Sequence, residues 1–152
     1  DYAAIPPLLP SGSDAAAPHL TWNGEPFRKG EATFFEISGC YRRYHAPFCR
    51  TLFLGEPSDI LKAAEAALVE GLEAGIDAAR AGNRACDVAN ALAAPLERAN
   101  ITRGERCGYP IGLSYPPDWG ERTMSFRAGD KALLKPGMSF DFVSEEDLGD
   151  AI

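Results

Sequence analysis

Two residues have side-chain types that acid–base chemistry uses, a glutamate within an apolar run and a histidine. Glu36 sits inside the apolar run FFEIS at 34–38, and a carboxylate buried in such a run costs free energy unless it is paired or used in a reaction. His19 is one of only two histidines, and an imidazole carries protons near neutral pH. From the residues alone, it stays open whether Glu36 faces solvent by strand alternation and whether His19 is a surface residue.

The segment RCGYPIGLSYPPDWGER at 106–122 is the second place where polar and aromatic side chains gather. Its density of proline and glycine excludes a helix or a central strand, so we expect an ordered, irregular loop. Such loops often serve recognition, although packing in the core or at a dimer contact is the alternative for its aromatic residues. The candidates in this loop are Tyr109, Tyr115, Asp118, Trp119, Glu121 and Arg122.

The composition argues against several classes of function. The two histidines do not lie at ligand spacing from acids, and the four cysteines form no Cys-x-x-Cys pair, so the sequence offers no metal cluster. A net charge of −7 disfavours nucleic acid or an anionic membrane as partner, and no apolar stretch is long enough to span a bilayer. We therefore expect a cytoplasmic protein with free thiols and no cofactor.

The apolar and turn patterns place these candidates on an α+β fold, because strands and helices run in separate blocks along the chain. Gly39-Cys40 separates two strands, and Pro47 predicts an interruption or bulge in the second. A stripe of apolar residues predicts the buried face of the first helix: Leu61, Ala64, Leu68, Leu72 and Ile76. The expected elements are strands at 18–22, within 31–55 and at 138–143, a helix from Ser58 to Gly82, and a helix capped by Asn83 that Pro95 kinks or shortens.

Four strings carry a resemblance to a known superfamily: PSGSDAAAPHLTW, GEATFFEISGCYRRYHAPFCRTLFLGEP, GYPIGLSYPPDWGER and LKPGMSF. Together they resemble the creatinase and prolidase superfamily over residues 8–140, and within it the ectoine hydrolase family. The resemblance implies a partial pita-bread (creatinase/aminopeptidase-like) fold, in which helices cover a curved antiparallel sheet. Residues 1–152 then form a single incomplete catalytic domain, because the family's opening helices are absent and the SEEDLGDAI end departs from the family's continuation.

The metallopeptidases of this superfamily bind two metal ions through two Asp, one His and two Glu, and the chain departs from that pattern. The resemblance places the first Asp at Glu36, the second Asp at Pro47 and the metal-binding His at Tyr109. A second catalytic His falls at Pro116, and the two Glu ligands fall at the end of the chain or beyond it. Since proline offers no donor atom, the resemblance implies no dinuclear metal centre.

Creatinase is a metal-free member of the superfamily, and the resemblance places its acid/base histidine at His19. Ectoine carries a cyclic amidinium whose carbon between two nitrogens is electrophilic. Its hydrolysis needs a carboxylate beside that carbon, a proton carrier for the leaving nitrogen, and groups that hold the substrate's own carboxylate. Glu36 is the candidate carboxylate, as nucleophile or as the base that activates water. The candidates for substrate binding are Tyr44, Arg50 and Tyr109 on the carboxylate and Trp119 on the amidinium.

Other functions stay open beside this one. The chain could belong to a metallopeptidase that acts on X-Pro peptides, or it could bind its ligand without turning it over. The expected partner is a small cationic or zwitterionic substrate, and the sequence does not separate ectoine from hydroxyectoine. The resemblance also implies a homodimer, while the net charge argues against nucleic acid or a membrane as a partner.

Overall fold

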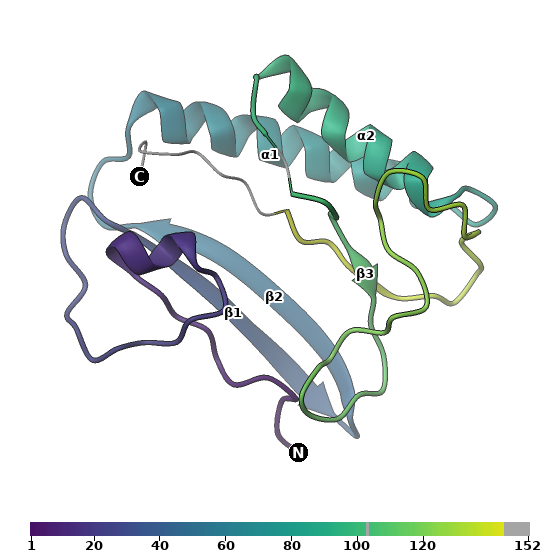
Figure 1. Cartoon of the computed structure of the whole chain (residues 1–152), viewed down its shortest axis with the longest axis horizontal. Helices are drawn as coiled ribbons and strands as arrows, with labels where there is room; N and C mark the ends of the chain where they lie inside the picture. The colour runs from purple at the N-terminus through teal and green to yellow at the C-terminus, as the bar shows by residue number, and fades with distance from the viewer. Residues whose placement is uncertain (103, 145–152) are drawn as a thin grey trace. The chain divides into compact units, whose positions relative to one another are not determined.

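The computed structural model describes residues 1–102 and 104–144, which fall into two compact units. The first unit holds residues 1–61 and 112–119, and the second holds residues 62–111 and 120–144. Within the described residues, two α-helices and two small antiparallel sheets make up a mixed α+β structure, which is the expected class (Figure 1). That the whole chain forms one incomplete catalytic domain stays a prediction.

A long antiparallel hairpin forms the centre of the first unit (Figure 1). β1 (Ala32–Tyr41) pairs residue for residue with β2 (Tyr44–Phe53), in a segment dense in the aromatic and β-branched residues that favour strands. Residues 8–11 run along the other edge of β1, where the backbones of Leu8 and Glu36 exchange hydrogen bonds of 2.9 and 3.0 Å. β1 is therefore held from both sides.

The segment before β1 differs from the expectation of a strand at 18–22. A 3-10 helix, η1 (Gly12–Ala16), comes first, and residues 18–22 form no regular element. The backbone N–H of Leu20 donates to Ala17 at 3.0 Å in a turn, while the Leu20 carbonyl accepts from Leu9 at 3.2 Å. Because the turn takes the donor of Leu20, no strand ladder forms here.

The hairpin turns at Arg42-Arg43 rather than at the expected Gly39-Cys40. Both arginines have positive φ, 48° and 68°, a conformation that costs free energy without glycine. The guanidinium of Arg43 offsets that cost: it donates to the carbonyl oxygen of Ser114 at 2.9 and 3.1 Å and to that of Tyr2 at 2.6 Å. Contacts from distant parts of the chain therefore decide where the hairpin turns.

The expected interruption at Pro47 is wrong, because the pairing of β1 with β2 runs through it without a bulge, with Ser38 opposite Pro47. β2 lies at the edge of its two-stranded sheet. A proline is tolerated on an edge strand because its missing N–H need not reach a partner.

The second unit contains α2 (Ala85–Arg98) and, from Lys62 on, α1 (Asp59–Ala78), and the two helices lie side by side (Figure 1). The predicted stripe on α1 is wrong in its later half, since Leu72 and Ile76 are exposed. The buried face of α1 is instead a seam of small residues: Ala64, Ala67, Gly71 and Gly75. On α2, the side chains of Val88, Leu92 and Leu96 form the buried core. Small residues on α1 let the two helix backbones approach closely.

α2 also departs from its predicted ends. Its N-cap is Arg84 rather than Asn83, and the Asp87 carboxylate accepts from the Arg84 backbone N–H at 2.9 Å. Pro95 does not end the helix, which continues to Arg98. Neither helix of the described chain combines the length and apolar character needed to cross a bilayer.

The second unit also contains a very short sheet. β3 (Tyr109–Pro110) pairs with β4 (Phe140–Asp141), so the strand expected at 138–143 has only two residues. The rest of 106–122 lacks α-helix and longer strand, as its proline and glycine content predicts.

Candidate active site

Glu36 lies in the middle of β1, directly opposite Cys49 of β2. Its side chain is only 7% exposed, which excludes the interpretation in which alternation turns it to solvent. Residues opposite each other in an antiparallel pair stand on the same face, so Cys49 is the cross-strand neighbour of Glu36. The alternating string FCRTLFL could have indicated this neighbour, but only with the register known.

His45 lies on the same hairpin face as Glu36, and both of its ring nitrogens form hydrogen bonds. Nε2 accepts the backbone N–H of Ala4 at 2.9 Å, and Nδ1 lies 3.0 Å from the carbonyl oxygen of Arg43. A carbonyl only accepts, so Nδ1 carries the proton. His45 is 5% exposed and therefore has a structural role in joining the amino-terminal segment to the hairpin tip.

His19, the predicted acid/base residue, lies exposed beyond η1 in the same unit as Glu36. Residues 8 and 9 lie between them. The backbone of Leu8 bonds to that of Glu36, and the backbone N–H of Leu9 donates to the carbonyl of Leu20, the residue after His19. His19 therefore lies one chain segment away from the strand that carries Glu36. Its catalytic role stays a prediction.

Tyr44 and Arg50 are not brought together with Glu36. Side chains alternate along β2, and because Cys49 shares the face of Glu36, both Tyr44 and Arg50 stand on the opposite face. The Arg50 guanidinium lies 4.1 Å from the ring centre of Phe48 and donates to the carbonyl oxygen of Cys49 at 2.6 Å. In this hairpin, the two residues do not converge with Glu36 on one substrate.

Trp119 belongs to the first unit and is 1% exposed. Its ring centre lies 6.4 Å from that of His45, and Ser114 Oγ donates to its carbonyl oxygen at 2.9 Å. The hairpin tip holds this part of the loop, because the Arg43 guanidinium also lies 4.7 Å from the ring centre of Tyr115. Stacking of Trp119 on a substrate stays a prediction, while its packing against His45 is what the structure describes.

Tyr109 is buried in the second unit, where it meets a residue that the sequence analysis missed. Its hydroxyl donates a hydrogen bond to the carboxylate of Asp141, the residue opposite it in the β3–β4 sheet. The Arg106 guanidinium lies 4.7 Å from the Tyr109 ring centre. Burial raises the pKa of Asp141 above its usual range, while the bond from Tyr109 and the charge of Arg106 act in the opposite direction. The sequence feature that could have indicated Asp141 is an acidic residue within the apolar string SFDFV at 139–143.

The raised pKa of Asp141 predicts a pH-dependent stability. A carboxyl group with a raised folded-state pKa stabilises the fold below its unfolded pKa of about 3.9, and that contribution is lost as the pH rises through the folded value. Asp141→Asn, which stays neutral, should therefore make the chain more stable than wild type at pH 7, with the difference vanishing below about pH 4. Urea unfolding at several pH values measures it. A variant less stable at pH 7 than at pH 3, relative to wild type, would contradict this.

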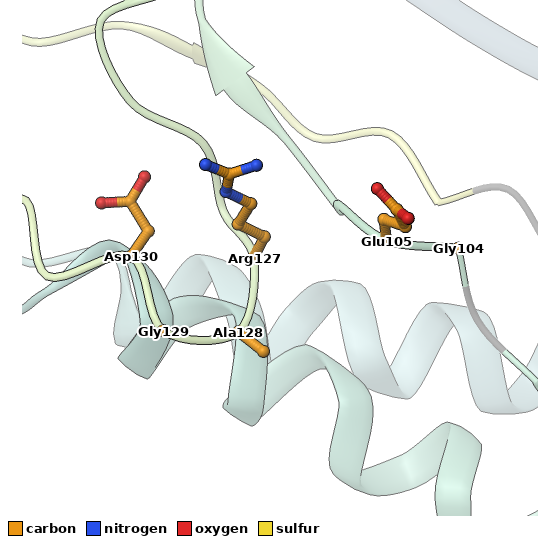
Figure 2. Close-up of a pocket in the computed structure, with 6 residues that line it drawn as sticks. All are labelled: Gly104, Glu105, Arg127, Ala128, Gly129 and Asp130. Atoms are coloured by element: carbon orange, nitrogen blue, oxygen red, sulfur yellow. The ribbon is translucent and has the colours of Figure 1, made fainter.

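A separate hollow of about 560 Å³ lies in the second unit (Figure 2). Its charged lining residues are Glu105, Arg127 and Asp130. The Asp130 carboxylate accepts the backbone N–H groups of Ser125 and Ala132, both at 2.9 Å, and thus holds the loop. No predicted site residue lines this hollow, so we assign it no role in the reaction.

The described residues do not fit the two-metal centre of the superfamily. Among them, no three His, Cys, Asp or Glu side chains gather in a group that could hold a metal ion. Pro47 shares the face of Glu36 but has no donor atom, and the Tyr109 hydroxyl is directed to Asp141. The donor set for two divalent cations is therefore incomplete in this part of the chain.

Comparison with solved structures identifies the fold. The X-Pro aminopeptidase of Thermotoga maritima superposes with a TM-score of 0.77 at 19% identity, covering 94% of this chain and 42% of that protein. The prolidase of Pyrococcus horikoshii gives 0.81 at 18% identity, covering 95% and 44%. At these identities the likeness establishes the fold alone, and it agrees with the pita-bread fold that the resemblance implies.

Comparison with curated proteins finds similarity to the ectoine hydrolase of Halomonas elongata, 59% identical over 144 residues that make up 94% of this chain and 36% of that protein. An uncharacterised hydrolase/peptidase of Sinorhizobium fredii is 34% identical over 91% of this chain and 35% of its own length. The chain thus spans about a third of these relatives. Residues 1–142 match metallopeptidase family M24, and the chain belongs to that family.

Proposed function

We propose that the protein that carries this chain is a hydrolase that opens the cyclic amidine ring of ectoine without a metal ion. The observation that carries the proposal is the 59% identity to an ectoine hydrolase over 94% of the chain. The buried carboxylate of Glu36 on β1 supports it, because hydrolysis of an amidinium needs a negative group beside the electrophilic carbon.

In the proposed reaction, Glu36 attacks the carbon between the two ring nitrogens or takes a proton from a water molecule that attacks it. One C–N bond of the ring then breaks, and His19 gives a proton to the leaving nitrogen. Where Glu36 is the nucleophile, water then attacks the same carbon and breaks its bond to the carboxylate. In either route the oxygen of water becomes the amide oxygen, and the freed nitrogen becomes an amine on the same open-chain molecule.

The absence of a metal in this mechanism has a direct test. We expect purified enzyme to lack stoichiometric manganese, cobalt or zinc, and to keep its rate of ectoine consumption after dialysis against a chelator, because Pro47 and Tyr109 cannot supply the missing metal ligands. Elemental analysis and an amine-release assay measure both quantities. Loss of activity that added metal restores, together with cleavage of X-Pro peptides, would instead support a metallopeptidase.

The proposal also separates turnover from binding. Calorimetric titration with ectoine and with hydroxyectoine gives the affinity for each, and product analysis gives the rate. Ectoine that binds and is never consumed would identify a binding protein rather than a hydrolase.

A further inference from the structure

The hairpin β1–β2 places a thiol beside the buried carboxylate, and the reaction above does not use it. Glu36 lies directly opposite Cys49, so both side chains stand on one face of the hairpin. Glu36 is 7% exposed, and Cys49 is half-buried. A carboxylate removed from water in this way costs free energy unless hydrogen-bond donors compensate for the lost hydration. The positions that adjoin Glu36 on this face decide which side chain can donate.

The hydrogen-bond pattern of β1 shows how closely the two side chains approach. The backbone N–H and carbonyl of Glu36 bond to Leu8, an apolar residue on the edge of β1 away from β2, at 3.0 and 2.9 Å. The carbonyl of Cys49 accepts the Arg50 guanidinium at 2.6 Å. Glu36 and Cys49 therefore form a non-hydrogen-bonded pair of the ladder, in which the Cα atoms are about 4.5 Å apart and the side chains lie closest to each other.

The other side chains at adjoining positions of the hairpin face are less suited to donate. On β1, Phe34 has no polar group, and the Ser38 hydroxyl donates to the carbonyl oxygen of the next residue at 3.0 Å. Diagonally across on β2, Pro47 has no donor and Thr51 is exposed. A diagonal neighbour is about 7–8 Å away, against about 5 Å for the residue directly opposite. Among these described positions, the Cys49 thiol is therefore the nearest side-chain donor.

The chemistry of a thiol suits a carboxylate that must react. Its S–H is a single, weak donor, whereas the two oxygens of a carboxylate offer about four lone-pair sites. One bond from the thiol thus restricts the orientation of the carboxylate and leaves lone pairs free to attack a carbon or to take a proton from water. A charged donor would bind the carboxylate more strongly and make it a weaker base.

We propose that Cys49 is a positioning residue whose thiol donates to the Glu36 carboxylate and holds it in the orientation that serves ring opening. This inference rests on the function proposed above. Both residues belong to one hairpin of the first unit, and the hydrogen bond between them does not depend on the substrate. The bond can therefore be tested separately from the reaction.

Steady-state kinetics on ectoine test the positioning role. Cys49→Ala should lower kcat about tenfold, the loss expected for one hydrogen bond to a charged group, with little change in KM. Cys49→Ser should recover most of that loss, because a hydroxyl also donates. Two matched controls on the same hairpin face, Cys40→Ala and Thr51→Val, should keep kcat within about twofold of wild type. An unchanged kcat in Cys49→Ala, or equal losses in Cys49→Ala and Cys49→Ser, would overturn the proposal.

A second readout needs no turnover: the S–H stretching band of Cys49 in the infrared spectrum, isolated as the difference between proteins with and without Cys49→Ser. A hydrogen bond lowers the frequency of this band, and a carboxylate accepts more strongly than an amide. Glu36→Gln should therefore move the band to higher frequency, while Glu65→Gln, at an exposed carboxylate on α1, should not. A band that Glu36→Gln leaves in place overturns the inference even if ectoine is hydrolysed, whereas a shifted band without hydrolysis contradicts only the proposed reaction.

Discussion

Replacing Glu36 with Gln should lower kcat for ectoine ring opening by at least about a thousandfold while the protein stays folded. Gln keeps the length and the hydrogen-bonding oxygen of the side chain but is neither a nucleophile nor a base. Glu36 is buried, and its backbone is bonded to Leu8 on one side and faces Cys49 on the other, so we expect the Gln side chain to take the same place in the strand. The assay is release of the ring-opened product under substrate saturation.

A matched control and a second variant sharpen this result. Glu65→Gln removes an exposed carboxylate on α1 and should leave kcat unchanged. Glu36→Asp shortens the side chain: a base that works through water should keep part of the activity, whereas a nucleophile should lose nearly all of it. Mass spectrometry of quenched wild-type enzyme would detect the substrate adduct that a nucleophilic Glu36 forms. Near wild-type kcat in Glu36→Gln would remove Glu36 from the mechanism.

The identity of the candidate carboxylate could be predicted from the sequence, but its surroundings could not. The string FFEIS indicates a strand with a carboxylate inside it, and the resemblance adds its role. Which residues share its face depends on the hairpin register, and the register depends on where the chain turns. The turn lies at Arg42-Arg43 because the Arg43 guanidinium bonds to Ser114, more than seventy residues away in sequence. No local pattern contains that contact.

The consequence for the site is direct. The observed register puts Tyr44 and Arg50 on the face of β2 opposite to that of Glu36, so the hairpin does not bring these two candidates to the carboxylate. Asp141 escaped notice for a related reason. Its carboxylate meets the Tyr109 hydroxyl only because its short strand pairs with a segment thirty-two residues earlier in the chain.

The helical seam of the second unit gives the largest expected effect on stability. Gly71→Ala should destabilise the chain by about 1–3 kcal/mol, although alanine is the better helix former by about 1 kcal/mol. A Cβ atom at position 71 would lie 2.6 Å from the backbone oxygen of Leu92. Backbone cannot move aside as a flexible side chain can, so α1 and α2 must separate and expose the core around Leu92.

Gly75→Ala is the matched control for this steric argument, one helical turn further along α1. Its Cβ would meet only side-chain atoms, those of Leu92 and Phe142, at 3.3–3.4 Å. These atoms can yield by a few tenths of an ångström, so the gain in helix propensity should nearly offset the crowding, and the variant should unfold within about 1 kcal/mol of wild type. Urea unfolding midpoints at constant slope measure both variants. If Gly71→Ala were as stable as Gly75→Ala, the close approach of the helix backbones at Leu92 would not explain why position 71 requires glycine.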